Sequence, residues 1–424
     1  ANLSGDFFVY FIAGVIQPDG SFSDKHFIHE GRELDHGISN YSCCLGLWRY
    51  RWMVFLSTAT TENFKKELIN MERKIVHVVG TGTIGEPLIG LLCDYRDQLG
   101  IDEVTFHKNS ALRRDRSKVT DLLRRGARLS VDEGKEQEFK KLGMDPDFET
   151  EESIKRASVV IDCTPKGIGH ANKAKYYEKF SDTVKGFLAQ GSEDGFGKKY
   201  ARGINDRALN ASDKFIQVVS CNTHNVSCLT NTLAVGADPD NLVEGKYVCV
   251  RRANDLSQAG NFIPAPQVGT HGDDKYGSHH AADAAALFAT LGMDLNLFSS
   301  AMKVNSQYMH VLWFNLKVKE PTTLASVKER LHNNDHVAMT TKDMTSTVFS
   351  FGRDHGHYGR IMNQTVVVEQ SLNVRNDHEI TGFCFTPQDG NSILSSISAA
   401  EWLLYPHSYK DKIQCLSHLF FNII

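Results

Sequence analysis

The sequence predicts an α/β protein with two large domains, one built on a parallel sheet and one an α+β domain with a mixed sheet. Three observations lead to this fold class. Between about residues 71 and 219, short apolar runs alternate with amphipathic stretches, which is the order of β-α-β units. A glycine-rich turn follows the first apolar run. From about residue 247, longer strand-like segments and longer loops replace the alternation.

The elements of the first domain follow one another as strand and helix. KIVHVVG (74–80) and EVTFHK (103–108) have the composition of strands, whereas EPLIGLLCDYRDQLG (86–100) and SKVTDLLRRG (117–126) have helical periodicity. ASVVIDCTP (157–165) is a continuous apolar run that ends at a proline, as expected of a strand buried on both faces. We therefore expect a parallel sheet with crossover helices.

The second domain is expected over residues 220–387. Its strand-like segments are KYVCVRR, HVLWFNLKVKE and TVVVEQSLNV, which suggest a mixed sheet with helices on one face. Residues 1–70 show no clear periodicity and form an N-terminal extension of unknown role, and residues 407–424 form a C-terminal tail.

Composition points to a soluble globular protein. The 424 residues are 41% hydrophobic and 23% charged, with a net charge of −4 that gives no electrostatic reason to expect nucleic acid as a partner. The apolar run at 7–16 is about half as long as a bilayer-spanning helix and has no basic flank, so neither a membrane span nor a secretory signal is expected. The nine cysteines show no zinc spacing, which favours reduced cytoplasmic thiols and no metal site.

GTGTIG at 80–85 fits the dinucleotide-binding pattern G-x-G-x-x-G. Gly80 would form the tight turn, Gly82 would let the pyrophosphate approach, and Gly85 would let the helix pack on the strand. At the end of the second strand, where an acidic residue usually binds the ribose, the chain has Lys108 and, beyond it, Arg113 and Arg114. These cations favour NADP, or use of both cofactors, although a solvated basic loop would have the same composition.

Cys221, in VVSCNT, follows an apolar run and precedes a helical stretch. A helix N-terminus lowers a thiol's pKa, and its amides can stabilise an oxyanion, so Cys221 is a candidate nucleophile; a buried thiol is the alternative. A nicotinamide cofactor and a cysteine together indicate aldehyde oxidation through a thiohemiacetal and a thioester.

These motifs carry a family resemblance. Residues 71 to 406 resemble the archaeal-type (type II) phosphorylating glyceraldehyde-3-phosphate dehydrogenases in GTGTIG, VVIDCTPKGIGHAN, AQGSEDG, VVSCNT, VRRAND, SHHAAD and DMTSTV, which keep their order and spacing. The resemblance implies a cytoplasmic homotetramer of glycolysis or gluconeogenesis that binds a small phosphorylated aldehyde, inorganic phosphate and NADP or NAD. It also implies that about 388–406 complete the NAD(P)-binding domain of residues 71–219.

The resemblance also implies roles for individual residues. Cofactor contacts are expected from Thr83, Ile84, Gly191, Arg252 and Gln388, besides Gly80, Gly82, Gly85 and Lys108 from the motifs. Cys221 would be the nucleophile, Asn222 would hold the oxyanion and His310 would accept the proton. Further substrate contacts are expected from Ser220, Arg251, His279 and His280.

The chain departs from the family after SCNT, where His224 and Asn225 replace the usual Thr-Gly. It departs again where Ala-Ala-Asp follows SHH, and where the Lys-His pair after AQG is missing. These positions are expected near the substrate. Two alternatives therefore stay open: a semialdehyde dehydrogenase or acyl-phosphate reductase of amino-acid biosynthesis, and a non-catalytic NAD(P)-binding descendant.

Overall fold

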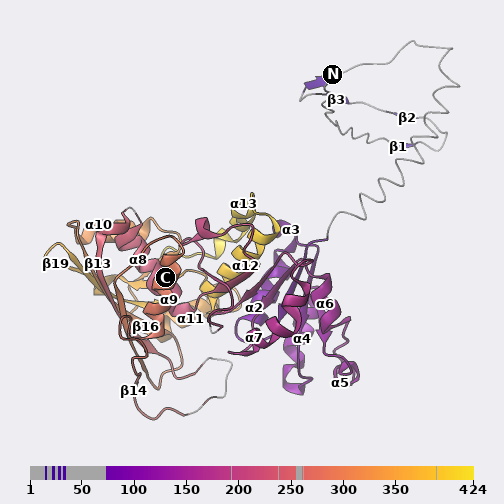
Figure 1. Ribbon diagram of the computed structural model, residues 1–424, viewed down its shortest axis with the longest axis horizontal. Helices are drawn as coiled ribbons and strands as arrows, with labels where there is room; N and C mark the ends of the chain where they lie inside the picture. Colours follow the sequence, from indigo (N-terminus) through magenta and orange to yellow (C-terminus); the bar gives the residue numbers. More distant parts are fainter. Residues whose placement is uncertain are drawn as a thin grey trace. The chain divides into compact units, whose positions relative to one another are not determined.

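The computed structural model describes residues 73–191, 193–236, 238–254, 260, 262–387 and 389–424, and the backbone of four short strands nearer the N-terminus (Figure 1). Residues 1–72 and 73–424 are separate compact units. In the first unit, β1 (Val15–Ile16) pairs with β2 (Phe22–Ser23), and β3 (Phe27–His29) pairs with β4 (Arg32–Leu34), both antiparallel. The rest of the predicted N-terminal extension lies outside the described residues.

The first sheet of the second unit has eight parallel strands in the order β11-β12-β10-β9-β5-β6-β7-β8. The chain builds one side of the sheet outward from β5 and then returns to add β9 on the other side of β5. This reversal between β5 and β9 is the switch point at which doubly wound sheets bind ligands. The strands are β5 (Ile75–Val79), β6 (Glu103–His107), β7 (Arg128–Val131), β8 (Phe148–Glu149), β9 (Val159–Asp162), β10 (Gly186–Ala189), β11 (Lys198–Tyr200) and β12 (Phe215–Val218).

Crossover helices cover this sheet, as the alternating pattern predicted. They are α2 (Gly85–Asp94), α3 (Arg96–Leu99), α4 (Arg116–Arg124), α5 (Glu136–Lys140), α6 (Thr150–Arg156) and α7 (Ile168–Asn172). The single helix predicted over 86–100 is wrong in detail, because Tyr95 leaves helical geometry (φ −111°, ψ 15°) and separates α2 from α3. Far along the chain, α12 (Gly390–Leu404) returns to this sheet, where Ile393 and Ile397 share a core with Val159.

The second sheet is mixed, in the order β14-β15-β13-β16-β20-β18-β17, with β19 beside β20. The pairs β13–β15 and β17–β18 are parallel and the others antiparallel. The fold class predicted from the sequence is therefore confirmed. The strands are β13 (Leu242–Arg251), β14 (Gln267–Val268), β15 (Leu297–Lys303), β16 (His310–Val318), β17 (Val337–Thr340), β18 (Thr365–Val368), β19 (Asn373–Arg375) and β20 (Glu379–Thr386).

Helices α8 (Cys221–Thr230), α9 (His279–Ala289) and α10 (Leu324–His332) cover one face of the mixed sheet. On part of the other face, Val348 of α11 (Thr345–His355) packs in a cluster with Val366 and the C-terminal Ile424. The sequence predicted helices on one face of the mixed sheet, whereas α11 also covers part of the other face.

The C-terminal residues pack into the fold. Tyr409 and Ile413 of α13 (Tyr409–Ile413) join the core of the parallel sheet. At the chain end, the Ile424 amide donates to the Met339 carbonyl at 2.9 Å, beside β17. The predicted tail therefore packs against both sheets.

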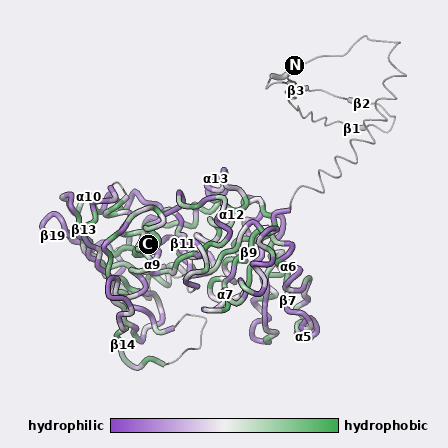
Figure 2. The backbone as a smooth tube through the Cα atoms, in the orientation of Figure 1, coloured by the Kyte–Doolittle hydropathy of each residue, from purple (hydrophilic) through white to green (hydrophobic). Residues whose placement is uncertain are grey.

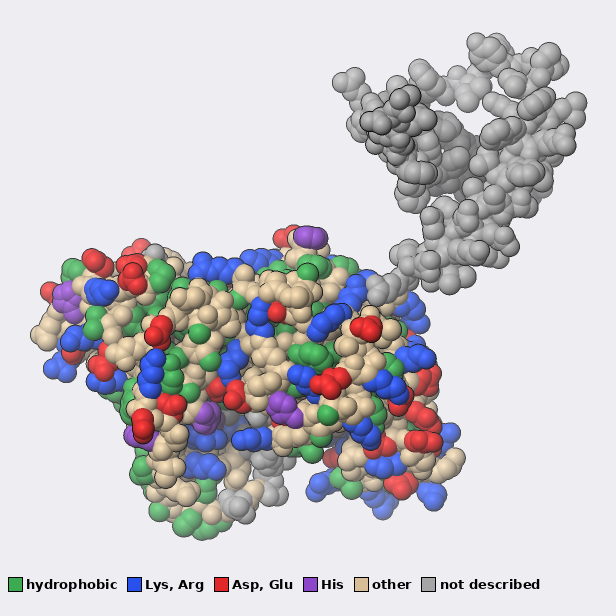
Figure 3. All heavy atoms as spheres, viewed as in Figure 1, with side chains coloured by type: hydrophobic (Ala, Val, Ile, Leu, Met, Phe, Trp, Pro, Cys, Tyr) green, Lys and Arg blue, Asp and Glu red, His purple; other side chains and the backbone are tan. Residues whose placement is uncertain are grey.

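The hydrophobic residues lie mainly in the interior, around strands such as β9, whereas α5, α10 and β19 are hydrophilic (Figure 2). Acidic and basic side chains are interspersed over the visible surface (Figure 3). No helix among the described residues combines the length and the apolar character that a membrane crossing requires.

Candidate active site

The glycine-rich turn lies between β5 and the N-terminus of α2. Gly80 has a φ of +95°, and a Cβ at Gly85 would lie 2.0 Å from the Gly80 carbonyl oxygen, so neither position accepts a side chain without backbone movement. A Cβ at Gly82 would meet no atom within 4 Å. The turn is therefore tightly packed at both ends and open in the middle, as a cradle for a pyrophosphate requires.

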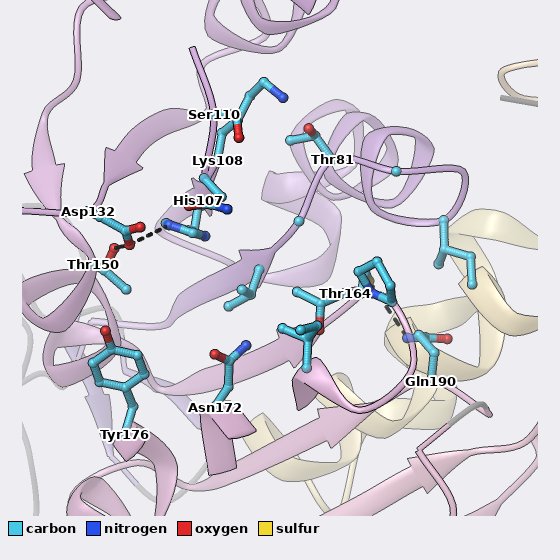
Figure 4. Close-up of a pocket in the computed structure, with 18 of the residues that line it drawn as sticks. Thr81, His107, Lys108, Ser110, Asp132, Thr150, Thr164, Asn172, Tyr176 and Gln190 are labelled. Atoms are coloured by element: carbon cyan, nitrogen blue, oxygen red, sulfur yellow. Dashed lines mark hydrogen bonds and ion pairs between the residues drawn. The ribbon is translucent and has the colours of Figure 1, made fainter. Parts of the chain in front are cut away.

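A cavity of about 880 Å³ opens at the carboxyl ends of β5, β6 and β9, which is the switch point of the sheet (Figure 4). Tyr176, Thr150 and Asp132 lie at one end, and Thr164 and Gln190 at the other (Figure 4). Its volume, the glycine cradle and the mixed polar lining fit a dinucleotide. Of the residues predicted to bind cofactor, the lining includes Gly80, Gly82, Thr83, Ile84 and Lys108.

The basic residues predicted for a 2′-phosphate do not stay together. Lys108 lines the cavity, but its Nζ lies 2.6 Å from Asp115 Oδ2, and both side chains are largely buried. Arg113 and Arg114 are exposed and lie outside the lining. The turn at 113–115 directs Asp115 toward Lys108 and leaves both arginines exposed, and their contact with a 2′-phosphate stays a prediction.

Cys221 is the first residue of α8, and Ser220 is its N-cap. The Ser220 hydroxyl accepts from the Thr223 amide and pairs with the Thr223 hydroxyl at 2.9 Å, so this side chain caps the helix. A Cβ at Gly191 would lie 2.3 Å from the Ser220 amide nitrogen. Gly191 thus lies against the backbone immediately before Cys221, next to the cavity-lining Gln190.

Cys221 is partly exposed, as are Cys163 and Cys415, and it is distinguished from them by its place at the start of α8. Burial raises the pKa of Cys93, Cys228 and Cys384 to about 12, and also raises those of Cys163, Cys249 and Cys415. Those six remain protonated near neutral pH. The helix start at Cys221 is the environment that favours a thiolate.

A fully buried threonine connects Cys221's neighbour to His310. Thr386 Oγ1 donates to Asn222 Oδ1 at 3.0 Å and accepts from Asn225 Nδ2 at 2.8 Å. In the antiparallel pair of β16 and β20, Thr386 lies directly opposite His310. Opposed residues of such a pair project from the same face of the sheet, so the start of α8 and His310 converge there.

His310 accepts a hydrogen bond at Nδ1 from the Arg252 amide at 2.9 Å. The neutral ring therefore carries its proton on Nε2. Burial, with the charges of Arg252 and Arg251, holds the pKa of His310 well below its usual range. His310 is a neutral Nε2–H donor in this geometry.

A cluster of one arginine and two histidines, Arg251, His279 and His280, lies beside His310. Burial, followed by the electrostatic effects of His279, Arg251 and His310, lowers the pKa of His280 well below its usual value. Within the described part of the chain, neither ring nitrogen of the buried His280 has a hydrogen-bond partner. Lys166 lines the cavity. Burial lowers the pKa of His279, the Asp283 carboxylate opposes this shift, and the charges of Arg251 and Lys166 lower the pKa further. The cluster thus extends from His310 toward the cavity.

Two further residues were predicted to contact the cofactor. Arg252 follows the end of β13 and is buried with its guanidinium 3.4 Å from the Tyr308 carbonyl oxygen, so it contributes charge beside His310 and is not part of the lining. Gln388 lies outside the described residues, although its neighbour Asp389 lines the cavity.

Sequence reasoning missed Thr386 and Arg360. Arg360 Nη2 donates to the Thr83 carbonyl at 3.1 Å and so supports the glycine turn from outside the cavity. Thr386 could be found only from strand register. No group of three or more His, Cys, Asp or Glu side chains in the described ranges could hold a metal ion.

The fold and these residues define a protein with a Rossmann-type sheet, a second mixed sheet, a dinucleotide-sized cavity and a cysteine at a helix start. Comparison with known proteins shows which enzymes the chain is similar to. The chain is 26% identical to glyceraldehyde-3-phosphate dehydrogenase 1 of Methanosarcina barkeri over 268 residues, which are 62% of this chain and 74% of that protein. It is 28% identical to glyceraldehyde-3-phosphate dehydrogenase of Metallosphaera sedula over 59% of this chain and 71% of that protein.

A third relative, glyceraldehyde-3-phosphate dehydrogenase 2 of Methanosarcina acetivorans, is 32% identical over 49% of this chain and 59% of that protein. No protein-family model matches the chain. The relatives confirm the resemblance to the archaeal-type glyceraldehyde-3-phosphate dehydrogenases that the motifs indicated.

Proposed function

We propose that the chain oxidises glyceraldehyde 3-phosphate to 1,3-bisphosphoglycerate with NADP or NAD, using Cys221 as the nucleophile. The observation that carries the proposal is the Thr386 hydroxyl, which bonds Asn222 beside Cys221 and lies opposite His310. The dinucleotide-sized cavity and the names of the relatives support the same reaction. Gly80, Gly82, Thr83 and Ile84 would hold the dinucleotide.

The chemistry begins at Cys221. Its thiolate attacks the aldehyde carbon, a C–S bond forms, and the carbonyl electron pair moves onto oxygen to give a thiohemiacetal. When bound, the nicotinamide supplies the acceptor for the hydride whose loss turns this adduct into a thioester. An oxygen of inorganic phosphate would then add to the thioester carbonyl, the C–S bond would break with Cys221 leaving as thiolate, and the proton of the phosphate would pass to solvent.

Asn222 is suited to hold the oxyanion. Thr386 donates to its Oδ1, so the amide NH₂ end points away from Thr386. The side chain is 2% exposed, and a buried donor needs no reorganisation as charge develops on the substrate oxygen. The amides at the start of α8 add to the same positive potential.

His310 would act first as a hydrogen-bond donor. With Nδ1 engaged by the Arg252 amide, the neutral ring offers Nε2–H to a thiolate or an oxyanion. The predicted role as proton acceptor would require the ring to lose that proton or give up the Arg252 amide. Donation by His310 is therefore the role that the geometry favours.

The cluster of Arg251, His279 and His280 would bind phosphate. Arg251, His279 and His280 lie together beside His310, and guanidinium and imidazole groups are suitable donors for phosphate oxygens. The His280 ring nitrogens, which lack described partners, would be satisfied by such a ligand. Which of these residues bind the substrate phosphate and which bind inorganic phosphate is part of the test below.

The test compares the purified chain with Cys221→Ser in steady-state assays with glyceraldehyde 3-phosphate, each dinucleotide, and inorganic phosphate present or absent. We expect phosphate-dependent turnover that Cys221→Ser abolishes, while dinucleotide binding by calorimetry is unchanged. Cys228→Ser, which alters a buried thiol of the same helix, is the matched control and should retain turnover. Activity confined to an amino-acid semialdehyde, or turnover by Cys221→Ser, would contradict the proposal.

We also propose a homotetramer. Phe383 and Tyr308 are exposed large apolar side chains on the face of β16 and β20 opposite to α8, and Met344 lies beside them. They line a second hollow of about 530 Å³. Apolar surface of this kind is usual where subunits meet. Light scattering of the intact chain tests the assembly, and a monomer at micromolar concentration would contradict it.

A further inference from the structure

The dinucleotide cavity contains an ion pair at the position where the ribose of the adenosine half is expected. Lys108 directly follows β6, and its side chain is 10% exposed. Its Nζ lies 2.6 Å from Asp115 Oδ2, and the Asp115 side chain is 17% exposed. Lys108 lines the cavity and Asp115 does not, so the carboxylate holds the ammonium from behind.

The ion pair is expected to affect the binding of NADP and of NAD differently. A 2′-phosphate carries close to two negative charges near neutral pH and would compete with Asp115 for the Lys108 ammonium. A 2′-hydroxyl carries no charge and leaves the pair intact. Arg113 and Arg114 are exposed and lie outside the lining, so they do not replace Lys108 when Asp115 occupies it.

We propose that Asp115 is a specificity-determining residue, which weakens the preference for a 2′-phosphorylated dinucleotide by occupying Lys108. The inference rests on the proposed function, because it assumes that the cavity binds a nicotinamide dinucleotide. Asp115 acts through Lys108 and touches no ligand itself. Use of both cofactors follows from this arrangement, since the pair opposes NADP without creating a new contact for NAD.

The experiment measures the dissociation constants of NAD⁺ and NADP⁺ by calorimetry, without aldehyde, for the intact chain and three variants. Asp115→Asn removes the competing charge, Lys108→Gln removes the ammonium, and the third variant combines both changes. Asp147→Asn is the matched control, because Asp147 pairs with Arg128 at 3.1 Å in the same domain and lies outside the cavity lining.

We expect Asp115→Asn to tighten NADP⁺ binding about tenfold, which corresponds to about 1.4 kcal/mol, and to change NAD⁺ binding less than about twofold. Asp147→Asn should leave both constants unchanged. In the Lys108→Gln background, Asp115→Asn should have no effect on the ratio of the two constants, because the ammonium for which the groups compete is gone.

An unchanged ratio in Asp115→Asn, with both dinucleotides still bound, would overturn the inference and leave the proposed function intact. A shift that persists without Lys108 would also overturn it, because the effect would then be a general one of charge. If the intact chain binds neither dinucleotide, the proposed function fails and this inference fails with it.

Discussion

Replacing Thr386 by valine tests the connection between α8 and the mixed sheet. Valine keeps the branched shape of threonine, so the change removes the hydroxyl and leaves most of the packing in place. Thr386 is fully buried, and its hydroxyl serves Asn222 at 3.0 Å and Asn225 at 2.8 Å. Thr386→Val therefore leaves one buried amide oxygen and one buried amide NH without this partner.

The magnitude follows from these two groups. A buried polar group that loses its partner costs roughly 1–3 kcal/mol, so the free energy of unfolding should fall by about 2–6 kcal/mol. The Asn222 amide would also lose its fixed orientation. We expect kcat for glyceraldehyde 3-phosphate to fall about 10- to 100-fold, somewhat less than the roughly 10²–10³-fold cost of deleting an oxyanion donor. Dinucleotide affinity should not change.

The matched control is Thr105→Val in the parallel sheet. Thr105 is also fully buried, and its hydroxyl lies 2.7 Å from His77 Nδ1, far along the chain from Cys221. Urea unfolding should show that both variants lose stability, while steady-state kinetics should show a loss of kcat only in Thr386→Val. If the two variants have the same kcat, the orientation of Asn222 by Thr386 is refuted.

Two further predictions concern a glycine and a buried carboxyl. In Gly191→Ala the new Cβ would lie 2.3 Å from the Ser220 amide nitrogen, so the backbone before Cys221 must move. We expect kcat/KM in steady-state assays to fall on the order of 10²-fold. An unchanged kcat/KM would contradict the close packing. Burial raises the pKa of Glu401 from 4.5 to about 8, so the folded chain binds this proton more tightly than the unfolded chain, and stability should fall as pH rises from about 4.5 to 8. Glu401→Gln should remove this dependence of stability on pH and should be more stable than the unchanged chain at pH 8, by at most on the order of 5 kcal/mol. Urea unfolding between pH 5 and 9 measures both. Equal pH dependence in the two proteins would contradict the raised pKa of Glu401.

The parallel sheet could be predicted because its signals are local. β5 and β9 are buried on both faces and so appear in the sequence as continuous apolar runs. The break at Tyr95 and the pairing of Ile424 beside β17 could not be predicted. The break depends on a local backbone conformation that periodicity does not report, and the pairing joins residues far apart in the chain.

The same distinction applies to the candidate site. Gly80, Gly82 and Gly85 are recognisable because they form one short motif, in which the turn itself demands glycine at Gly80 and Gly85. Thr386 lies 164 residues from Asn222, and only the register of β20 against β16 brings it opposite His310. The Lys108 charge was visible in the sequence, but its neutralisation by Asp115 depends on how the turn between them folds.

His224 and Asn225, which replace the family's usual Thr-Gly, have a different meaning in the structure than in the sequence. Both are fully buried, and each has a partner inside the protein: His224 Nε2 lies 2.8 Å from Ser395 Oγ of α12, and Asn225 bonds Thr386. His224 Nδ1 lies 3.0 Å from the Ser220 carbonyl oxygen and so donates to it, and burial lowers the pKa of His224 to about 4.

Because His224 is neutral near pH 7 and both of its nitrogens are engaged, it adds no charge next to Cys221 and cannot replace His310. The two substitutions therefore help to hold α8 in position. Under the proposed function, recognition of the phosphorylated substrate would depend on the cluster of Arg251, His279 and His280.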